Sequence, residues 1–505
     1  MNIWLINPFD ELPGEGPEQR YACLARHLSD RGHAVTWITA DFHHRKKEMR
    51  SAECGVRNEE NEESGKPTGA PNAVSAGAKG ALPISHLPYS ISRMPYSLLL
   101  IPAPPYRSNT SLKRLHSHRI WARNVRAHLL QQVKSGSMPP PDLILASTPP
   151  LEGAAAAVKL GQALHAKIVV DVMDRWPENW LTLLPSARPV QALGRLLLTP
   201  WTRLARRVFR EPDALCAQSQ AFADYAANRG QRLARRGGVE RRSDVAPTSP
   251  TPRSSASSPP KRKLWSSLPA LPHSKDASRP SPTPHVCHLG ASPRMPYSVS
   301  RIPRACEPFP SPTSPDLSPL PSNLFQIVYL GAMGRFYDIE TVLQAMAHAK
   351  RDGRLWQLTL AGTDPEGIWQ RRVAELGLED SVSLPGYLQK EALETTLTSS
   401  HVGLIPMNPS SGVAVPYKVG DYLSHGIPII SSLPGELETH LLQSGAGLQY
   451  RFGDPVDLFR VLSTVAEDAV FRTQAPAAAK SLFETHFNRE ITYPLWAQWL
   501  ENIAP

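Results

Sequence analysis

A lysine and a carboxylate three residues apart stand out near the C-terminal end of this chain. Lys418 and Asp421 lie in the run at residues 413–432, VAVPYKVGDYLSHGIPIISS, which predicts a loop, a short helix, a Gly-Pro turn and a buried strand. A helix N-terminus with an adjacent lysine attracts phosphate. Asp421 can accept hydrogen bonds from sugar hydroxyls. The pair therefore indicates a nucleotide sugar, although the same residues also fit a solvated ion pair on an ordinary surface helix.

A second acidic segment follows a predicted strand in the first half of the chain. Residues 171–177 read DVMDRWP and come directly after the apolar run Ile168-Val169-Val170, at the end of a parallel strand where ligands bind. Asp174 could orient or deprotonate an acceptor hydroxyl, and Trp176 could stack on a sugar ring. Alternatively, Asp174 caps the next helix and Trp176 belongs to the core.

Two glycine-bearing loops are further candidates for binding phosphate. Gly14 and Gly16 follow the first predicted strand, but their spacing is not that of a complete dinucleotide-binding motif, and a tight turn explains them equally well. Arg335 lies in a loop between a strand and a helix in the second half of the chain. It is a plausible diphosphate ligand or, equally, a surface residue.

Alternating strands and helices must position these loops. Apolar strand-sized runs and helical periodicity alternate in both halves of the chain, which predicts an α/β protein with two parallel sheets. The predicted strands are Ile3–Ile6, Val35–Ile38, Leu143–Ala146, Ile168–Val170, Ile327–Leu330, Leu358–Ala361, Val402–Ile405 and Ile427–Ser432, and the predicted helices include residues 18–31, 153–165 and 339–350.

Taken together and in this order, the motifs resemble the retaining glycosyltransferases of family 4, of the polysaccharide-building type. That family has the GT-B fold, two Rossmann-like domains with a cleft between them, and shows a Pro-x-Lys-(Val/Leu)-x-(Asp/Glu)-Tyr-Leu signature, which Pro416 to Leu423 match. The resemblance covers residues 1–47, 98–230 and 324–500. It implies that Asp421 holds the ribose of the donor.

The sequence departs from the family at two places. In many members a second acidic residue lies eight positions before the first, where this chain has Val413; the backbone N–H groups of Gly412 and Val413 could still face the diphosphate or the sugar. The arginine and lysine usual in the loop near residue 335 are Ala332 and Tyr337 here, so that Arg335 is the candidate substitute.

The resemblance implies a mechanism without a protein nucleophile, in which the acceptor attacks from the front face and the departing diphosphate assists. Lys418 and Arg335 would stabilise the diphosphate, Asp421 would hold the ribose, and Asp174 would lie on the acceptor side with Gly14 and Gly16 near the cleft. Residues 106–118 look like the acceptor side of that subfamily, although an exposed basic helix explains most of them.

The distribution of proline and of charged residues along the chain indicates inserted segments. The 505-residue chain has 51 prolines and a net charge of +10; residues 231–323 hold 19 of the prolines and 14 basic against 5 acidic residues. Such a segment is expected to be disordered. The pentapeptide RMPYS occurs at residues 93–97 and again at 294–298, which indicates related insertions. We therefore expect an acceptor domain at 1–230 with an insert at about 48–95, a basic insert at 231–323, a nucleotide-sugar domain at 324–480, and helices at 481–505 that cross back to the first domain.

The expected activity is transfer of a hexose from a UDP- or GDP-linked sugar to a saccharide or lipid-linked acceptor in cell-surface polysaccharide synthesis. No cofactor or metal is expected, because the five cysteines show no metal-site spacing. No apolar run is long enough to span a bilayer, so the expected location is the cytoplasm or the inner face of a membrane. The alternatives are a sugar-nucleotide epimerase of the same fold, a binding protein with a decayed site, and nucleic-acid binding through the basic insert, which is the least favoured.

Overall fold

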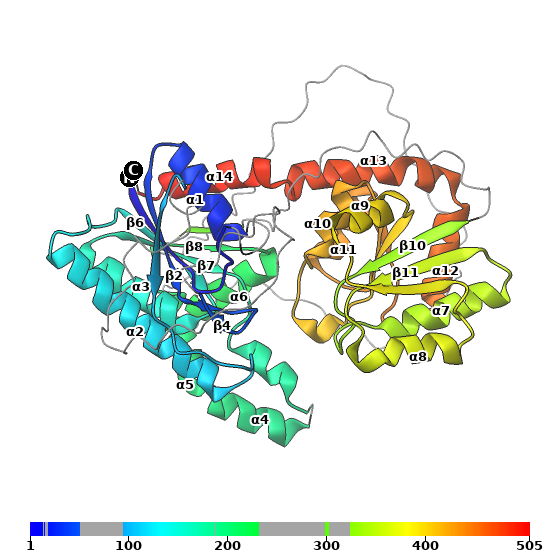
Figure 1. The fold of residues 1–505 in the computed structure, drawn as a ribbon, viewed down its shortest axis with the longest axis horizontal. Helices are drawn as coiled ribbons and strands as arrows, with labels where there is room; N and C mark the ends of the chain where they lie inside the picture. Colours follow the sequence, from blue (N-terminus) through cyan, green and yellow to red (C-terminus); the bar gives the residue numbers. More distant parts are fainter. Residues whose placement is uncertain are drawn as a thin grey trace, which may run out of the picture.

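The computed structural model describes residues 1–13, 15, 19–50, 94–185, 187–231, 298–301 and 324–504. Two α/β domains lie side by side, each built on a parallel sheet, and a long helical segment at the C-terminal end runs along both of them (Figure 1). The predicted fold class, two Rossmann-like domains, is confirmed.

The first domain contains a seven-stranded parallel sheet with the order β5-β2-β1-β6-β7-β8-β9. In β1, Trp4 packs into the core on one face, while Ile3 and Leu5 pack into the core on the other. A strand buried on both faces needs an uninterrupted apolar run, which is why β1 and β6 are recognisable in the sequence. The strands are β1 Asn2–Ile6, β2 Ala34–Ala40, β5 Ser97–Ile101, β6 Leu143–Thr148, β7 Lys167–Val172, β8 Ala214–Ala217 and β9 Ser298–Arg301, and a hairpin is formed by β3 Phe42–His43 and β4 Glu48–Met49.

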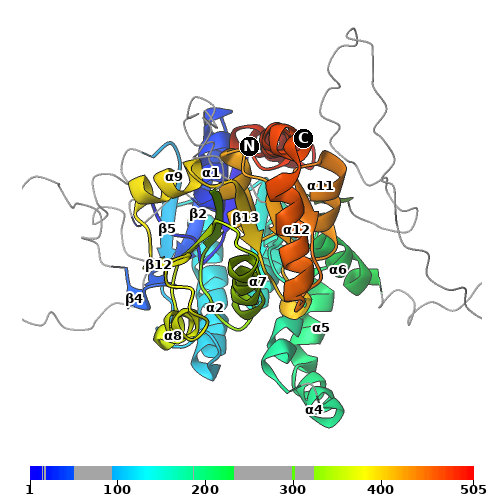
Figure 2. The ribbon, with the colours of Figure 1, turned by 90° about the vertical axis from the view of Figure 1, so that its right-hand side faces the viewer.

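Helices cover this sheet and form a projection at one end. The helices are α1 Arg20–Asp30, α2 Leu112–Lys134, α3 Leu151–Leu164, a 3-10 helix at Glu178–Leu183, α4 Arg188–Leu197, α5 Thr199–Val208 and α6 Gln220–Gln231. Both views show α4 extending away from the sheets (Figures 1 and 2).

The second domain contains a six-stranded parallel sheet with the order β12-β11-β10-β13-β14-β15. The strands are β10 Phe325–Leu330, β11 Trp356–Ala361, β12 Val382–Gly386, β13 Val402–Ile405, β14 Ile429–Ser431 and β15 Gly447–Gln449. The helices are α7 Ile339–Arg351, α8 Ile368–Glu375, α9 Lys390–Thr398, α10 Lys418–Ser424, α11 Glu436–Ser444 and α12 Pro455–Glu467, with 3-10 turns at Pro365–Gly367 and Pro409–Ser411.

The last two helices connect the domains. In α13 (Ala469–His486), Leu482 and Phe483 pack into the core of the second domain, and in α14 (Arg489–Glu501), Trp496 and Leu500 pack into the core of the first. Figure 1 shows the two helices as one continuous arm along the molecule. Within the described residues no helix is both long and apolar enough to cross a bilayer.

Of two further strands, β9 lies where the sequence indicated only inserted material, and β5 comes directly after the other predicted insert. The residues that follow the two copies of the RMPYS repeat form β5 and β9, the opposite edges of the first sheet. Strand β9 lies within the predicted insert at 231–323, so that this segment supplies an edge of the first domain. The rest of that insert, and residues 51–93 of the predicted insert at 48–95, fall outside the described residues.

Candidate functional site

Helix α10 is fixed to the second sheet by one buried tyrosine. The hydroxyl of Tyr422 accepts a hydrogen bond from the N–H of Leu330 at the end of β10, at 2.9 Å. Its ring lies against Gly403 of β13, where an added Cβ would come within 2.6 Å of the ring. The start of α10 is therefore held at the carboxyl ends of β10 and β13, the edge at which parallel sheets bind ligands.

The side chain of Lys418 is buried at this edge. Its Nζ lies 3.9 Å from the centre of the Tyr329 ring and 4.3 Å from that of Tyr337. No described residue accepts a hydrogen bond from Nζ, and the residue is only 7% exposed. Burial lowers the pKa of Lys418 to about 7, and the nearby Asp421 carboxylate opposes that shift. The two aromatic faces stabilise the ammonium, but they do not satisfy its hydrogen bonds.

Two glycine turns lie above this ammonium. Gly331 has φ +113°, and a Cβ there would be 3.2 Å from Nζ of Lys418. Gly362, with φ +148°, lies so close to the backbone of Gly331 that an added Cβ would be 2.0 Å from its carbonyl oxygen. The loops after β10 and β11 thus approach each other through backbone alone. The N–H groups of both glycines donate to backbone carbonyls, of Ala361 and of Gly386, so the group left without a partner here is the ammonium of Lys418.

The Asp421 carboxylate lies on the same turn of helix as Lys418. Burial raises its pKa to about 6, partly offset by the charge of Lys418. Ser424 Oγ donates to the backbone carbonyl of Asp421 at 3.0 Å, and His425 Nδ1 lies 2.9 Å from the same carbonyl. No described side chain donates to the carboxylate itself, so both of its oxygens can accept bonds from hydroxyl groups.

The burial of Lys418 decides between the two interpretations that the sequence left open for it. A solvated surface pair is wrong for Lys418, because the tyrosines of β10 and of the loop before α7 cover its side chain. The helix that begins at Lys418 is only seven residues long. The positive charge at this edge therefore comes from the lysine itself, and a helix dipole adds little.

The remaining predicted donor ligands lie in different surroundings. Arg335 is exposed, and its guanidinium packs on the ring of the neighbouring Phe336 at 4.6 Å. Gly412 has φ +76°, and the N–H of Val413 donates to Ser411 Oγ at 3.3 Å. The Val413 amide is thus already partnered. Gly14 and Gly16 lie outside the described residues.

A cleft between the two domains is lined by predicted site residues of both domains: Gly412 and Val413 of the second domain and Asp174 of the first. Its second-domain wall is the segment from Gly412 to Tyr417, directly before Lys418. Its first-domain wall carries mostly polar side chains: Asn7, Asp10, Gln19, His44, Arg45, Arg114, Asp174, Asn179, Gln218 and Ser219. Gly412 comes close to the opposite wall, because an added Cβ there would be 3.1 Å from Asn179 Oδ1.

Asp174 faces this cleft from the end of β7. Its Oδ1 accepts hydrogen bonds from the side-chain amide of Asn179 and, at 2.7 Å, from the backbone N–H of Arg175. The 3-10 helix that follows begins at Glu178, and its N-cap residue is Pro177, with no side-chain cap, so capping is the wrong interpretation of Asp174. Trp176, by contrast, is 4% exposed in the core. The core interpretation of Trp176 is therefore the right one.

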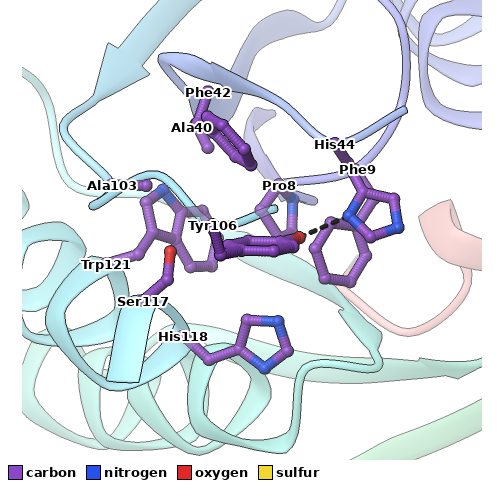
Figure 3. A pocket seen from close by; sticks show the side chains of 10 residues that line it. All are labelled: Pro8, Phe9, Ala40, Phe42, His44, Ala103, Tyr106, Ser117, His118 and Trp121. Carbon is purple, nitrogen blue, oxygen red and sulfur yellow. Dashed lines mark hydrogen bonds between the residues drawn. The ribbon is translucent and has the colours of Figure 1, made fainter. Parts of the chain in front are cut away.

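An aromatic pocket opens beside the first-domain wall (Figure 3). The ring of Tyr106 lies between Phe42, His44 and His118, and its hydroxyl hydrogen-bonds to His44 Nδ1. Burial lowers the pKa of His44 and of His118 to about 3 each, with Arg114 contributing, so both rings are neutral. Phe9 and His44 line both this pocket and the cleft.

Arg114 connects the aromatic pocket to the cleft. It donates to the carbonyl of Asn109 at 2.8 Å and to His118 Nε2 at 3.3 Å, and it lies over Phe9 at 5.6 Å. The exposed basic helix expected at residues 106–118 is therefore only partly right, because Tyr106, Ser117 and His118 are buried. A repeat of buried positions at Ser117, Trp121 and Val125 could have indicated this face of α2.

Sequence reasoning missed Asp10, which lies in the loop after β1. Its carboxylate accepts a hydrogen bond from the N–H of Tyr21 at 2.8 Å and lies 3.2 Å from the amide of Asn7, and burial raises its pKa to about 6.

Deeper in the sheet, Asp171 forms a buried ion pair with Arg20 at 2.9 and 3.0 Å. No group of three or more His, Cys, Asp or Glu residues in the described part of the chain could hold a metal ion.

Comparisons with known proteins agree with this architecture. Residues 325–468 match the family model Glycosyl transferases group 1. The sucrose-phosphate synthase of Thermosynechococcus elongatus is similar in structure, with a TM-score of 0.56 and 15% identity, and the match covers 99% of this chain and 98% of that one. HepE of Anabaena in complex with UDP has a TM-score of 0.57 and 12% identity, over 99% of this chain and 100% of that one.

A third similar structure is WaaG, a glycosyltransferase involved in lipopolysaccharide biosynthesis, with a TM-score of 0.51 and 11% identity over 100% of this chain and 99% of that one. No curated protein matches the sequence. The fold is thus GT-B, and the matched second domain supports a glycosyltransferase.

Proposed function

We propose that this chain, with a GT-B fold and a second domain that matches the group 1 glycosyl transferases, is a retaining glycosyltransferase. It moves a sugar, a hexose in our proposal, from a nucleotide-sugar donor to a saccharide or lipid-linked acceptor. We place it in family 4, in cell-surface polysaccharide synthesis, in the cytoplasm or at the inner face of a membrane. No metal or other cofactor is part of this proposal.

The proposal of a donor site rests on one observation: the ammonium of Lys418 is buried, and no described residue accepts a hydrogen bond from it. A buried cation without an acceptor is destabilising unless a ligand supplies one. An anionic diphosphate above Lys418, beside the glycine turns at Gly331 and Gly362, would satisfy the ammonium. It would also keep Lys418 protonated at neutral pH, because a nearby negative charge favours the charged form.

The other donor contacts follow from the geometry of α10. Asp421 lies on the same helical turn, and its carboxylate is available to the two hydroxyl groups of a ribose. The segment Gly412–Tyr417 leads from the cleft to Lys418, so the transferred sugar would lie toward Gly412 and Val413. Arg335 is exposed and could reach the diphosphate only by leaving the ring of Phe336.

In the proposed reaction the bond between the anomeric carbon and the diphosphate breaks, and the negative charge that develops on the leaving oxygen is stabilised by Lys418. The acceptor hydroxyl attacks from the same face and transfers its proton to the departing diphosphate. Asp174, held by Asn179 on the opposite wall of the cleft, orients that hydroxyl. The protein contributes positioning and charge, and it supplies no nucleophile.

UDP is the first nucleotide to test. HepE of Anabaena, which is similar in fold, has been captured with UDP, and a further structure of it contains UDP-glucose. A pyrimidine diphosphate would occupy the same edge of the second sheet in this chain.

The test is calorimetric titration of the full chain with UDP, GDP and their common sugar conjugates, beside Lys418→Met and Asp421→Asn. We expect one nucleotide to bind, with an affinity at least about tenfold weaker in each variant, since each loses a charge-assisted bond. Thermal melting of each variant establishes that it is folded. Absence of binding by the folded wild type would exclude the proposal. Conversion of the donor sugar without any acceptor would favour an epimerase.

A further inference from the structure

Helix α4 projects from the first domain, away from both sheets (Figures 1 and 2). Helix α5 follows it after the single residue Leu198 and packs on α3 and α6, and we call the two helices together the α4–α5 segment. Neither helix contributes to the cleft. Their sequence, RPVQALGRLLLTPWTRLARRVFR at residues 188–210, contains six arginines and no acidic residue. Nothing in the cleft therefore assigns the α4–α5 segment to donor or acceptor binding.

Helix α4 exposes its apolar face. Leu193, Leu196 and Leu197 are 57%, 68% and 65% exposed, and their spacing places them on one side of the helix. The side that packs on the protein is instead small and polar. Gly194 contacts Leu184, and the Gln191 amide donates to the carbonyls of Leu181, Leu184 and Pro185. Large leucines are thus directed away from the body of the protein.

Helix α5 and the residues after it carry a basic stripe. Arg203, Arg206, Arg207 and Arg210 follow the i, i+3, i+4, i+7 spacing of one helical face. The opposite face is anchored by the buried residues Ala205 and Val208 and by Trp201, whose Nε1 donates to Glu152 at 3.0 Å. None of the four arginines pairs with a carboxylate anywhere in the described ranges of the chain, unlike Arg229 and Arg372, which do.

Exposed leucines that adjoin unpaired arginines are complementary to the surface of a membrane that contains anionic lipids. A bilayer with anionic lipids offers hydrocarbon at the depth of the leucines and phosphate groups at the level of the arginines. A protein partner would need an apolar groove rimmed with acids to match the same features. Because α4 is a projection with a short leucine face, it fits shallow insertion into a membrane surface.

We propose that the α4–α5 segment docks this protein on membranes that contain anionic lipids, with Leu193, Leu196 and Leu197 inserted and the arginine stripe on the headgroups. This interaction is independent of donor binding. It would hold the first domain, which carries the acceptor wall of the cleft, beside the bilayer.

The experiment is co-sedimentation of the full chain with vesicles of neutral phosphatidylcholine and with vesicles that also contain 30% phosphatidylglycerol. The wild type should bind the anionic vesicles and dissociate as salt is raised. Arg203→Gln/Arg207→Gln should weaken the partition coefficient by about tenfold or more, because each arginine near an anionic surface strengthens binding severalfold. Leu193→Ser/Leu196→Ser/Leu197→Ser should weaken it by at least as much and leave the residual binding more sensitive to salt.

Matched controls lie in the second domain. Leu355→Ser/Leu442→Ser replaces leucines that are 59% and 52% exposed, and Lys390→Gln/Arg451→Gln removes two exposed charges. Both should bind like the wild type. The test retains the basic segment at 231–323 in every variant, so any vesicle binding due to that segment is common to all of them.

Three results would overturn the proposal. The first is that the folded wild type does not bind anionic vesicles. The second is that the α4 and α5 variants bind as tightly as the controls, which would assign binding to another part of the chain. The third is a concentration-dependent dimer in the absence of lipid that the leucine variant abolishes, since a second copy would then cover α4. UDP titration of each α4 or α5 variant should match the wild type, which separates this proposal from the donor site.

Discussion

Gly331 lies directly above the ammonium of Lys418. A side chain cannot be added there without approaching Nζ, because a Cβ would be 3.2 Å away, and the backbone has φ +113°. The N–H of Gly331 donates to the carbonyl of Ala361 at 2.8 Å, which fixes the turn to the next strand. The glycine is therefore required by two separate constraints, one of conformation and one of space.

We predict that Gly331→Ala destabilises the fold by about 1–2 kcal/mol, the cost of forcing an L-residue to positive φ. It should also weaken nucleotide binding, because the new methyl group displaces Lys418 or its ligand. Chemical denaturation measures the first effect and calorimetry the second. Gly334→Ala is the control within the same loop, since Gly334 has no positive φ and no neighbour within 4 Å of an added Cβ. Equal stability of the two variants would contradict this account of the turn.

The pH dependence of donor binding should be bell-shaped. Burial brings the pKa of Lys418 down to about 7 and that of Asp421 up to about 6, so both are charged only in a narrow window. Above pH 7 the lysine loses its proton and its attraction for the diphosphate. Below pH 6 the carboxylate gains a proton and becomes a weaker acceptor. We predict that the association constant for a nucleotide sugar is largest between about pH 6 and 7.

A nucleotide sugar is the right ligand for this measurement, because its diphosphate does not titrate in the range. Binding above pH 7 should be accompanied by proton uptake, seen as a dependence of the calorimetric enthalpy on buffer. Asp421→Asn should remove the acid limb and leave the alkaline limb. Tyr329 and Tyr337, which face Lys418, have pKa values raised by burial and stay neutral throughout. A flat profile from pH 5 to 9 would disprove the assignment of both groups.

The sequence predicted the central strands and the candidate loops, but not the burial of their side chains. Apolar runs such as Ile3–Ile6 and Ile327–Leu330 identify strands that are buried on both faces. The environment of Lys418 could not be predicted in this way, because Tyr329 and Tyr337 are about eighty to ninety positions away in the chain. Only the order of strands β10 and β13 brings these residues together.

Composition also misleads where a basic helix buries one of its faces. In α2 the basic composition indicated an exposed helix, yet His118 is buried against Tyr106. Strand β5 was missed because a repeated, low-complexity segment adjoins it. Helix α4 shows the opposite case, since its leucines look like core residues in the sequence and are exposed in the structure.

Replacing Asp174 should affect turnover more than donor binding. Its carboxylate lies on the first-domain wall of the cleft, across from the segment Gly412–Tyr417. We predict that Asp174→Asn lowers kcat by about 10²-fold, within the range for groups that orient or assist a proton transfer, and leaves the Kd of the nucleotide unchanged. Initial rates measured with varied acceptor give kcat. Asp352→Asn, an exposed carboxylate of the second domain, is the control. A loss of nucleotide affinity in Asp174→Asn would place the residue on the donor side instead.

Removal of one partner of the buried ion pair between Arg20 and Asp171 should strongly destabilise the first domain. Arg20 donates to both carboxylate oxygens and lies 4.0 Å from the centre of the Trp496 ring of α14, so it also anchors the arm that connects the domains. We predict that Arg20→Met destabilises the protein by about 3–5 kcal/mol, because Asp171 is left as a buried charge without its partner.

A double replacement separates the charge from the packing. Arg20→Met/Asp171→Leu removes both charges and should recover much of the lost stability, since an apolar pair can replace a buried ion pair at little cost. Arg372→Met is the surface control, because its bonds to Glu340 and Glu375 are solvent-exposed and screened, so that their loss should change the stability little. Denaturant unfolding monitored by Trp fluorescence gives all of these values. If Arg20→Met cost no more than Arg372→Met, the pair would not be the anchor of α14, and the packing of Trp496 and Leu500 alone would hold that helix.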